Sequence, residues 1–319
     1  MKREKNFQKE KYFEEVKEAV RNKIPEELRD EIIVNTQEVI KTNDQILHGI
    51  SLKFPGRESM PTFYMEDFYS EYKAGRSAEE IADIIIRISI ESYKTAPEFE
   101  NIPLTYEEIK DKLVLQMVDE ERNKDRLKDL VYKPVSNGFV MIPYIVIKTD
   151  CQGSMRTVIT KAMASEYEYN IEILMEQAFI NTMKHCEPVF MGICDIINMV
   201  KTYASKNPMK ADFKIEGSQG MYVLTNSARH DGATTLFYPG LMKRIGEIID
   251  DNYYVLPSSI HELILVPKAE ASSVGELQER VKEINSTVVD PREVLCDRVL
   301  LYDRKKDQLI ETAEENKIV

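Results

Sequence analysis

The sequence lacks three features that would indicate a class of function: paired cysteines, long apolar runs and glycine-rich phosphate-binding motifs. Its four cysteines, Cys151, Cys186, Cys194 and Cys296, form no CxxC pair, so we expect free thiols and no zinc site. No run of about 18 apolar residues could span a bilayer, and the N-terminal segment lacks the apolar core of a signal peptide. Neither a GxGxxG motif after a strand nor a P-loop is present. The sequence therefore predicts a soluble, cytoplasmic protein with no membrane partner.

Excess positive charge is also absent. The chain carries 43 Lys and Arg against 55 Asp and Glu, which gives a net charge of -12 at pH 7. Proteins that bind the phosphate backbone concentrate Lys and Arg to release counterions, so this composition disfavours a nucleic acid partner. The 319 residues, of which 43% are hydrophobic, suffice for two medium globular domains. We expect an N-terminal α+β domain over 1–135 and a C-terminal α+β sheet domain over 136–319.

The N-terminal half has the pattern of a β-hairpin flanked by helices. Two apolar runs, IIVNTQEVI at 32–40 and QILHGISLKF at 45–54, flank turn-forming residues at 42–44. The following segment, 62–72, carries four aromatic rings near helical spacing, at Tyr64, Phe68, Tyr69 and Tyr72. We expect a helix that packs on the hairpin, and an aromatic binding surface is the alternative.

Two further helices are indicated by the spacing of a capping box, in which a Ser or Thr is followed three residues later by Glu. The first begins at Ser77–Glu80 and continues into an isoleucine-rich segment. The second begins at Thr105–Glu108 and is expected to carry its apolar positions as far as Val118. Both are predicted to lie in the N-terminal domain.

The C-terminal half alternates short strands and helices. In order, we expect a strand at 138–148 paired with 155–164, a helix at 171–182 capped from Ser165, a linker at 201–219, strands at 221–225 and 233–238, a helix at 241–249, strands near Tyr254 and at 263–266, helices at 277–284 and 290–296, and a strand at 298–303. Strands joined by short turns are typical of antiparallel sheets. The expected fold class is α+β, an N-terminal helix/β-hairpin/helix domain followed by a mainly antiparallel sheet with helices on one face.

Chemically versatile side chains gather in two loops between the short strands of residues 221–266. The first loop carries Asn226, Arg229, His230 and Asp231, and the second carries Ser258, Ser259, His261 and Glu262. If the strand pairs are neighbours in the sheet, the two loops converge. The sequence therefore predicts a candidate site at 226–232 and 257–262, with the aromatic segment as a second candidate surface.

Three functions compete for the two-loop site. A hydrolase would use Ser258 or Ser259 as nucleophile, His230 or His261 as base, and Asp231 or Glu262 to orient the base, although PSSIH is not a GxSxG turn. A zinc or manganese site would recruit His230, Asp231, His261 and Glu262, although HExxH spacing is absent.

We therefore expect neither metal nor cofactor. The leading hypothesis is a non-enzymatic binding or regulatory module whose partner is a protein or a small molecule. The remaining alternative is a structural subunit of a larger assembly.

Three blocks of sequence carry a family resemblance. They are TNDQILHGISLKFPG with FYMEDFYSEYKAGRSAEEI, then MYVLTNSARHDGATTLFYPG, and finally YYVLPSSIHELILVP with EINSTVVDPREVLCDRVLLYD. With these blocks, and the LPSSIHE string above all, the chain resembles an uncharacterised bacterial family of unknown function, DUF family 5688. The resemblance implies an intracellular bacterial origin and an α+β fold, and it assigns no catalytic residue.

Overall fold

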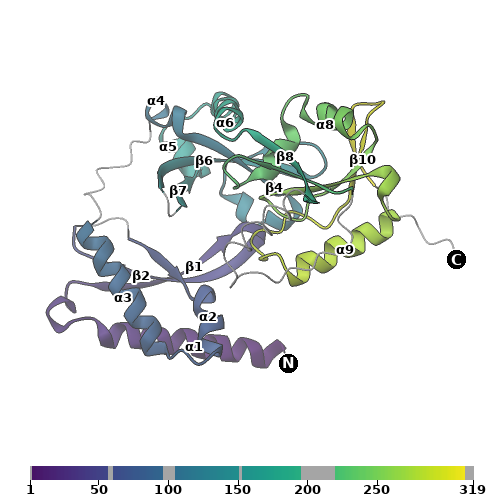
Figure 1. The fold of residues 1–319 in the computed structure, drawn as a ribbon. Coiled ribbons are helices and arrows are strands. Elements are labelled where there is room, and N and C mark those ends of the chain that lie inside the picture. The colour runs from purple at the N-terminus through teal and green to yellow at the C-terminus, as the bar shows by residue number, and fades with distance from the viewer. Residues whose placement is uncertain (1, 57–59, 96–104, 151–152, 195–219, 313–319) are drawn as a thin grey trace, which may run out of the picture. The chain divides into compact units, whose positions relative to one another are not determined.

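The computed structural model describes residues 2–56, 60–95, 105–150, 153–194 and 220–312 (Figure 1). The expected linker at 201–219 and Cys151 lie outside these ranges, whereas Cys186, Cys194 and Cys296 are free thiols as expected. Contacts divide the chain into two compact units. Unit 1 comprises Met1–Lys41 and Gln45–Pro103, and unit 2 comprises Thr42–Asp44 and Leu104–Val319.

Unit 1 is a small antiparallel sheet covered by helices. Its elements are α1 (Lys2–Lys23), β1 (Ile33–Lys41), β2 (Gln45–Lys53), β3 (Thr62–Tyr64), α2 (Met65–Lys73) and α3 (Ala78–Thr95). The sheet order is β1-β2-β3, so the predicted hairpin is confirmed. The capping box before α3 is also confirmed, because the Ser77 N–H donates to Glu80 Oε2 over 2.8 Å and the Glu80 N–H donates to Ser77 Oγ over 3.2 Å.

Unit 2 begins with a four-stranded antiparallel sheet. It is built from β4 (Leu113–Asp119), β5 (Lys133–Pro134), β6 (Phe139–Asp150) and β7 (Gly153–Val158), and β4, β5 and β7 all pair with β6. Residue 135, the expected domain boundary, lies in unit 2 between the paired strands β5 and β6. The compact units thus divide the chain earlier than the predicted domains do.

The helix expected from Thr105 to Val118 is wrong beyond its first turn. The capping box at Thr105 is present, but α4 (Tyr106–Ile109) ends after four residues, and a 3-10 helix at Lys110–Lys112 leads into β4. Along β4, Leu113, Leu115 and Met117 pack in the large hydrophobic core of unit 2. Val114 and Val118, on the other face of the strand, pack in a separate and smaller hydrophobic cluster. A strand buried on both faces is apolar at nearly every position, so its sequence resembles that of a buried helix.

The rest of unit 2 is a six-stranded antiparallel sheet with helices. The remaining elements are α5 (Lys161–Glu166), α6 (Ile171–His185), β8 (Pro188–Gly192), β9 (Tyr222–Asn226), η7 (Gly232–Phe237), α8 (Leu241–Ile249), β10 (Tyr253–Leu256), β11 (Leu263–Pro267), η8 (Lys268–Glu270), α9 (Val274–Thr287), β12 (Leu300–Asp303) and β13 (Gln308–Glu311). The strand order is β13-β12-β10-β11-β9-β8. The α+β class is confirmed.

The helices of unit 2 differ in placement from the expectation. Tyr253 and Val255 share a core with residues of α8, whereas Tyr254 and Leu256 share a cluster with residues of α9. Successive side chains of a strand point to opposite faces, so α8 and α9 cover opposite faces of the sheet. Both faces of the sheet, and not one, are covered by helices.

Three local expectations in unit 2 need correction. The strand predicted at 233–238 is the 3-10 helix η7, and the short helix predicted at 290–296 forms turns. Asn170, not Ser165, caps α6, because its side chain accepts the N–H of Ile173 over 3.2 Å. In η7, the hydroxyls of Thr234 and Thr235 donate to backbone carbonyls three residues earlier, which favours a tight turn over an extended strand.

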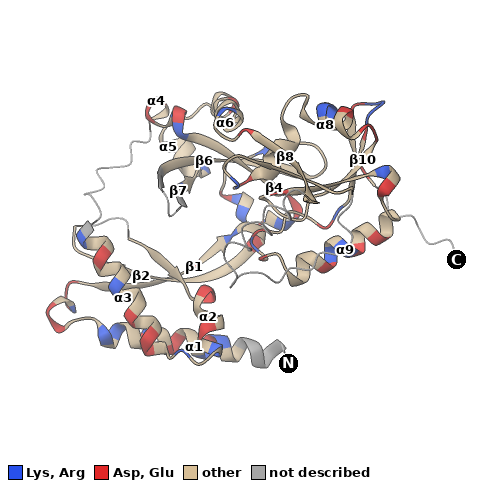
Figure 2. Cartoon of the chain, viewed as in Figure 1, with Lys and Arg blue, Asp and Glu red and all other residues tan. Residues whose placement is uncertain are grey.

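Acidic and basic residues are interspersed along the surface helices (Figure 2). Lys17 pairs with Glu14 on α1, and Lys282 pairs with Glu279 on α9. Exposed pairs of this kind contribute little to stability. Of the helices that the structure describes, none is both long enough and apolar enough to cross a membrane.

The last turns of α6 are joined to the outer edge of β4 by side-chain hydrogen bonds. Thr182 Oγ1 accepts the N–H of Leu115 over 2.9 Å and donates to the carbonyl of Ala178 over 2.6 Å. Asn181 Nδ2 donates to the carbonyls of Lys110 and Leu113 over 2.7 and 3.1 Å. This junction places the end of α6 beside β4.

We expect Thr182→Val to lower the free energy of unfolding by about 1–3 kcal/mol, because it leaves the buried N–H of Leu115 without an acceptor. Thr287→Val is the matched control, since Thr287 makes the same bond to the carbonyl four residues earlier but lies exposed at the end of α9. Urea unfolding measures both variants, and equal losses would contradict the assigned role of the Leu115 bond.

Candidate functional site

The two histidine-bearing loops converge, because β9 and β11 are hydrogen-bonded neighbours. The backbone N–H of Asp231 donates to Nδ1 of His261 over 3.1 Å. The imidazole rings of His230 and His261 meet edge to face, with 4.7 Å between their centroids. The sequence-based expectation that the loops 226–232 and 257–262 would come together if their strands were adjacent therefore describes the structure.

The bend of the first loop depends on a close backbone approach at Gly232. A Cβ atom at this position would lie 2.2 Å from the carbonyl oxygen of His261, so a side chain cannot be accommodated without displacement of the neighbouring loop. Asp231 adopts a left-handed conformation with φ of 54°, which Asp tolerates better than most residues. Buried Asn226 braces the loop, since its Nδ2 donates to the carbonyl of His230 over 2.8 Å.

Asp231 is the centre of a buried polar network. Its carboxylate accepts hydrogen bonds from Gln116 Nε2 over 2.7 Å, from His230 Nδ1 over 2.8 Å and from the guanidinium of Arg156. Gln116 in turn accepts the hydroxyl of Tyr144 over 3.0 Å. Gln116, Tyr144 and Arg156 come from β4, β6 and β7, so the network ties the first loop to the four-stranded sheet.

The partners of Asp231 decide its charge. Burial alone would raise the pKa of this carboxyl group, but the hydrogen bond from His230 and the positive charge of Arg156 outweigh burial and lower the pKa to about 2. Asp231 is therefore ionised at neutral pH. Both of its carboxylate oxygens already accept hydrogen bonds, Oδ1 from Gln116 and Oδ2 from Arg156 and His230.

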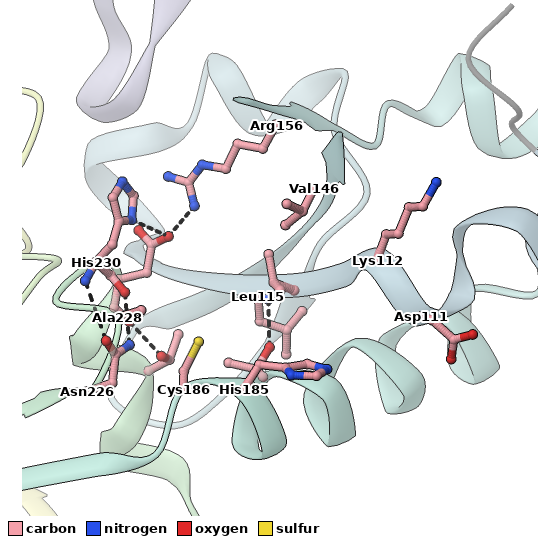
Figure 3. A pocket seen from close by; sticks show the side chains of 14 residues that line it. Asp111, Lys112, Leu115, Val146, Arg156, His185, Cys186, Asn226, Ala228 and His230 are labelled. Atoms are coloured by element: carbon pink, nitrogen blue, oxygen red, sulfur yellow. Dashed lines mark hydrogen bonds and ion pairs between the residues drawn. The ribbon is translucent and has the colours of Figure 1, made fainter. Parts of the chain in front are cut away.

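A cavity of about 600 Å³ opens beside this network (Figure 3). We call it the Asp231 cavity. In Figure 3, dashed lines join Arg156 and His230 to the carboxylate between them, whereas Lys112 and Asp111 lie at the opposite end. The wall combines the end of α6, strands β4, β6 and β7, and the first loop. It is lined by Asp111, Lys112, Val114, Leu115, Val146, Arg156, Thr182, His185, Cys186, Asn226, Ala228, His230, Asp231 and Thr234.

Only part of the predicted site lies on the cavity wall. Asn226, His230 and Asp231 line it, whereas Arg229, Ser258, Ser259, His261 and Glu262 do not. Ser259 is buried, and its Oγ accepts the N–H of His261 over 3.0 Å, so it holds the second loop in shape. His261 faces Glu293, with 3.5 Å between Nε2 and Oε1.

Sequence reasoning missed the residues that reach the site from the four-stranded sheet. Gln116 stands among apolar residues in LVLQMVD, and Arg156 stands in the strand segment MRTVIT. Polar side chains inside apolar strands were the one available signal, because burying them requires partners. Cys186 also lines the cavity. Burial and the charge of Asp231 raise the pKa of its thiol, so the reactive thiolate is scarce at neutral pH.

The metal hypothesis has a partial geometric basis. His230, Asp231 and His261 bring possible ligand atoms within 4.8 Å of one another, and Glu262 is not part of this cluster among the described residues. The guanidinium of Arg156 already pairs with Asp231, and its positive charge repels a cation. The N–H of Asp231 also occupies Nδ1 of His261. The expectation that no metal or cofactor is bound stays a prediction.

The second candidate surface, in unit 1, is used largely for packing. Phe68, Tyr69 and Tyr72 are partly buried against the core of unit 1, and Tyr72 lies 4.5 Å from Tyr12 between ring centroids. The hydroxyl of Tyr72 donates to Glu15 over 2.6 Å. Tyr64, at the start of α2, lies under the ammonium group of Lys41. Three of the four rings thus attach α2 to its own unit.

The lowered pKa of Asp231 predicts how Asp231→Asn depends on pH. Because the folded pKa lies below the ordinary value of 3.8, the carboxylate stabilises the protein fully above about pH 4, and this contribution is lost as pH falls through about 2. We expect Asp231→Asn to cost about 2 kcal/mol at pH 7, and roughly half of that near pH 3. Asp125→Asn, on an exposed turn, is the control. Urea unfolding at both pH values tests this, and a pH-independent cost would contradict it.

The comparisons with known proteins place the chain in one family. Residues 9–304 match the model of the family of unknown function DUF5688, which is most of the chain. Neither the curated proteins nor the solved structures contain a significant match. The expected family membership is thereby confirmed, and the chain belongs to the family DUF5688.

Proposed function

We propose that this chain is a binding protein that holds a small molecule in the Asp231 cavity. The observation that carries the proposal is the cavity itself, whose volume of about 600 Å³ falls in the range of roughly 300–1,000 Å³ typical of small-molecule sites. Its lining combines an apolar patch with converging polar and charged side chains, which can fix the orientation of a ligand. A concave site of this kind favours a small molecule over a protein partner.

The contacts around the cavity support binding over catalysis. The carboxylate of Asp231 is held by three donors. Neither serine of the hydrolase hypothesis lines the cavity, and the thiol of Cys186 is held protonated by its surroundings. A network in which polar groups satisfy one another makes a rigid, preformed wall, which lowers the entropic cost of binding.

A large side chain at Ala228 tests the proposal directly. Ala228 is exposed at the cavity wall, so Ala228→Trp fills part of the space without disturbing a core. The chain has no tryptophan, so the new residue is also a unique fluorescence probe. Ala269→Trp, at another exposed alanine, is the matched control.

We expect some members of a panel of small carboxylates, phosphates, nucleotides and neutral metabolites to raise the melting temperature of the wild type, because ligands that bind only the folded state stabilise it. The shift should persist in Ala269→Trp and disappear in Ala228→Trp. Persistence in both variants would locate binding elsewhere, and no shift with any compound would remove the support for this function.

Hydrolysis is a second candidate, and one contact favours it. The bond of 2.8 Å between His230 Nδ1 and Asp231 Oδ2 fixes the orientation of a half-exposed imidazole at the cavity wall. An oriented histidine can accept a proton from water as the water attacks a carbonyl carbon. In this version the nucleophile is water, and Ser258 and Ser259 have no chemical role.

If the protein is a hydrolase, it should cleave p-nitrophenyl acetate faster than buffer does, and His230→Gln should reduce this rate by about 100-fold or more. His48→Gln in unit 1 should leave the rate unchanged. Release of p-nitrophenol is followed by absorbance. A wild-type rate no faster than buffer, or an equal effect of both substitutions, would dismiss hydrolysis.

A further inference from the structure

We propose that the ligand of the Asp231 cavity is a singly charged carboxylate with an apolar body, bound through the guanidinium of Arg156, and that Asp231 is an internal counter-ion that weakens this binding. The inference rests on the proposed binding function and specifies its ligand class. It follows from the hydrogen-bonding capacity that the cavity leaves unused.

Arg156 is the main source of that capacity. Its side chain is only 18% exposed, and it is held by the ion pair with Asp231 and by stacking over the ring of Tyr144, 4.5 Å from the ring centroid. A guanidinium has five N–H donors, and the bond to Asp231 is made by Nη1. Among the described residues, no acceptor pairs with Nε or Nη2. The guanidinium is therefore held rigidly with donors to spare, as a carboxylate receptor requires.

The other polar side chains on the wall point to the same ligand charge. The side chains of Lys112 and His185 line the cavity and form no hydrogen bond or ion pair with the residues that the structure describes. Both oxygens of Asp231 are already occupied. Asp111 is exposed at the end of the cavity remote from His230 (Figure 3), where its neighbour Lys112 offsets its charge. Spare donors outnumber spare acceptors, which favours an anion over a cation.

The apolar part of the wall defines the rest of the ligand. Val114, Leu115 and Val146 line the cavity and are half-buried or buried. An apolar body placed against them is removed from water, which stabilises the complex. Asp231 already offsets the charge of Arg156, so the site suits one negative charge better than the two of a phosphate.

The ion pair predicts effects of opposite sign for its two members. Arg156→Gln removes the receptor, so carboxylate binding should be lost. Asp231→Asn keeps a hydrogen-bond acceptor for Arg156 but removes the competing negative charge, so carboxylate binding should become tighter although the protein becomes less stable. If Asp231 only maintained the shape of the cavity wall, Asp231→Asn would weaken carboxylate binding instead.

Isothermal titration calorimetry with octanoate and octanamide tests the inference, because the two probes share one apolar body and differ in charge. We expect the wild type to bind octanoate about tenfold or more tighter than octanamide. Arg156→Gln should abolish this preference, and Asp231→Asn should tighten octanoate binding several-fold. Arg304→Gln and Asp250→Asn are matched controls from an ion pair of 3.2 Å outside the cavity, and neither should alter binding.

Each other outcome has a defined meaning. Equal binding of both probes, blocked by Ala228→Trp, would overturn the carboxylate inference and leave the small-molecule function intact. Binding of neither probe by the wild type would also overturn the inference, and the panel with Ala228→Trp then decides the function separately.

Tighter binding of inorganic phosphate than of octanoate would overturn the choice of a single charge. If Arg156→Gln does not fold by circular dichroism, Arg156→Lys, which keeps the charge without the planar fork, should still weaken octanoate binding.

Discussion

The ionised carboxylate of Asp231 is the constraint on which the site depends. A charge this deeply buried is tolerated only because a guanidinium, an imidazole and an amide all donate to it. The donors stand on two different strands of one sheet and on the loop itself, so satisfying the carboxylate fixes the loop against the sheet. The same arrangement orients His230 and Arg156 at the cavity wall.

Much of the framework could be predicted from local pattern. The hairpin β1–β2, the helices α3, α8 and α9, and the strands β9, β10 and β11 were predictable because periodicity and turn residues agree there. The convergence of His230 with His261 was predicted only on the condition that their strands are neighbours, and the pairing of β9 with β11, which are separated in sequence by α8 and β10, meets that condition. Ser258 and Ser259 show the limit, because a serine that holds a loop and a serine that attacks a substrate look alike in sequence.

Strand β4 and the cavity could not be predicted from the local sequence pattern, for physical reasons. Strand β4 is apolar on both faces, so its period of two is hidden, and the capping box before it indicated a longer helix. Arg156 and Gln116 acquire their roles only through a partner that lies 75 and 115 residues away in the chain. One sequence carries no direct record of such pairings, so the cavity itself could not be foreseen.

The junction between α6 and β4 has one more consequence. An outer strand offers unpaired N–H and carbonyl groups that can recruit a strand from another molecule and start aggregation. Thr182 and Asn181 occupy such groups at Leu115 and Leu113. The side chains of a helix thus cover the first part of this edge, where an added strand from another molecule would have to break the bonds to Thr182 and Asn181 before it could pair with β4.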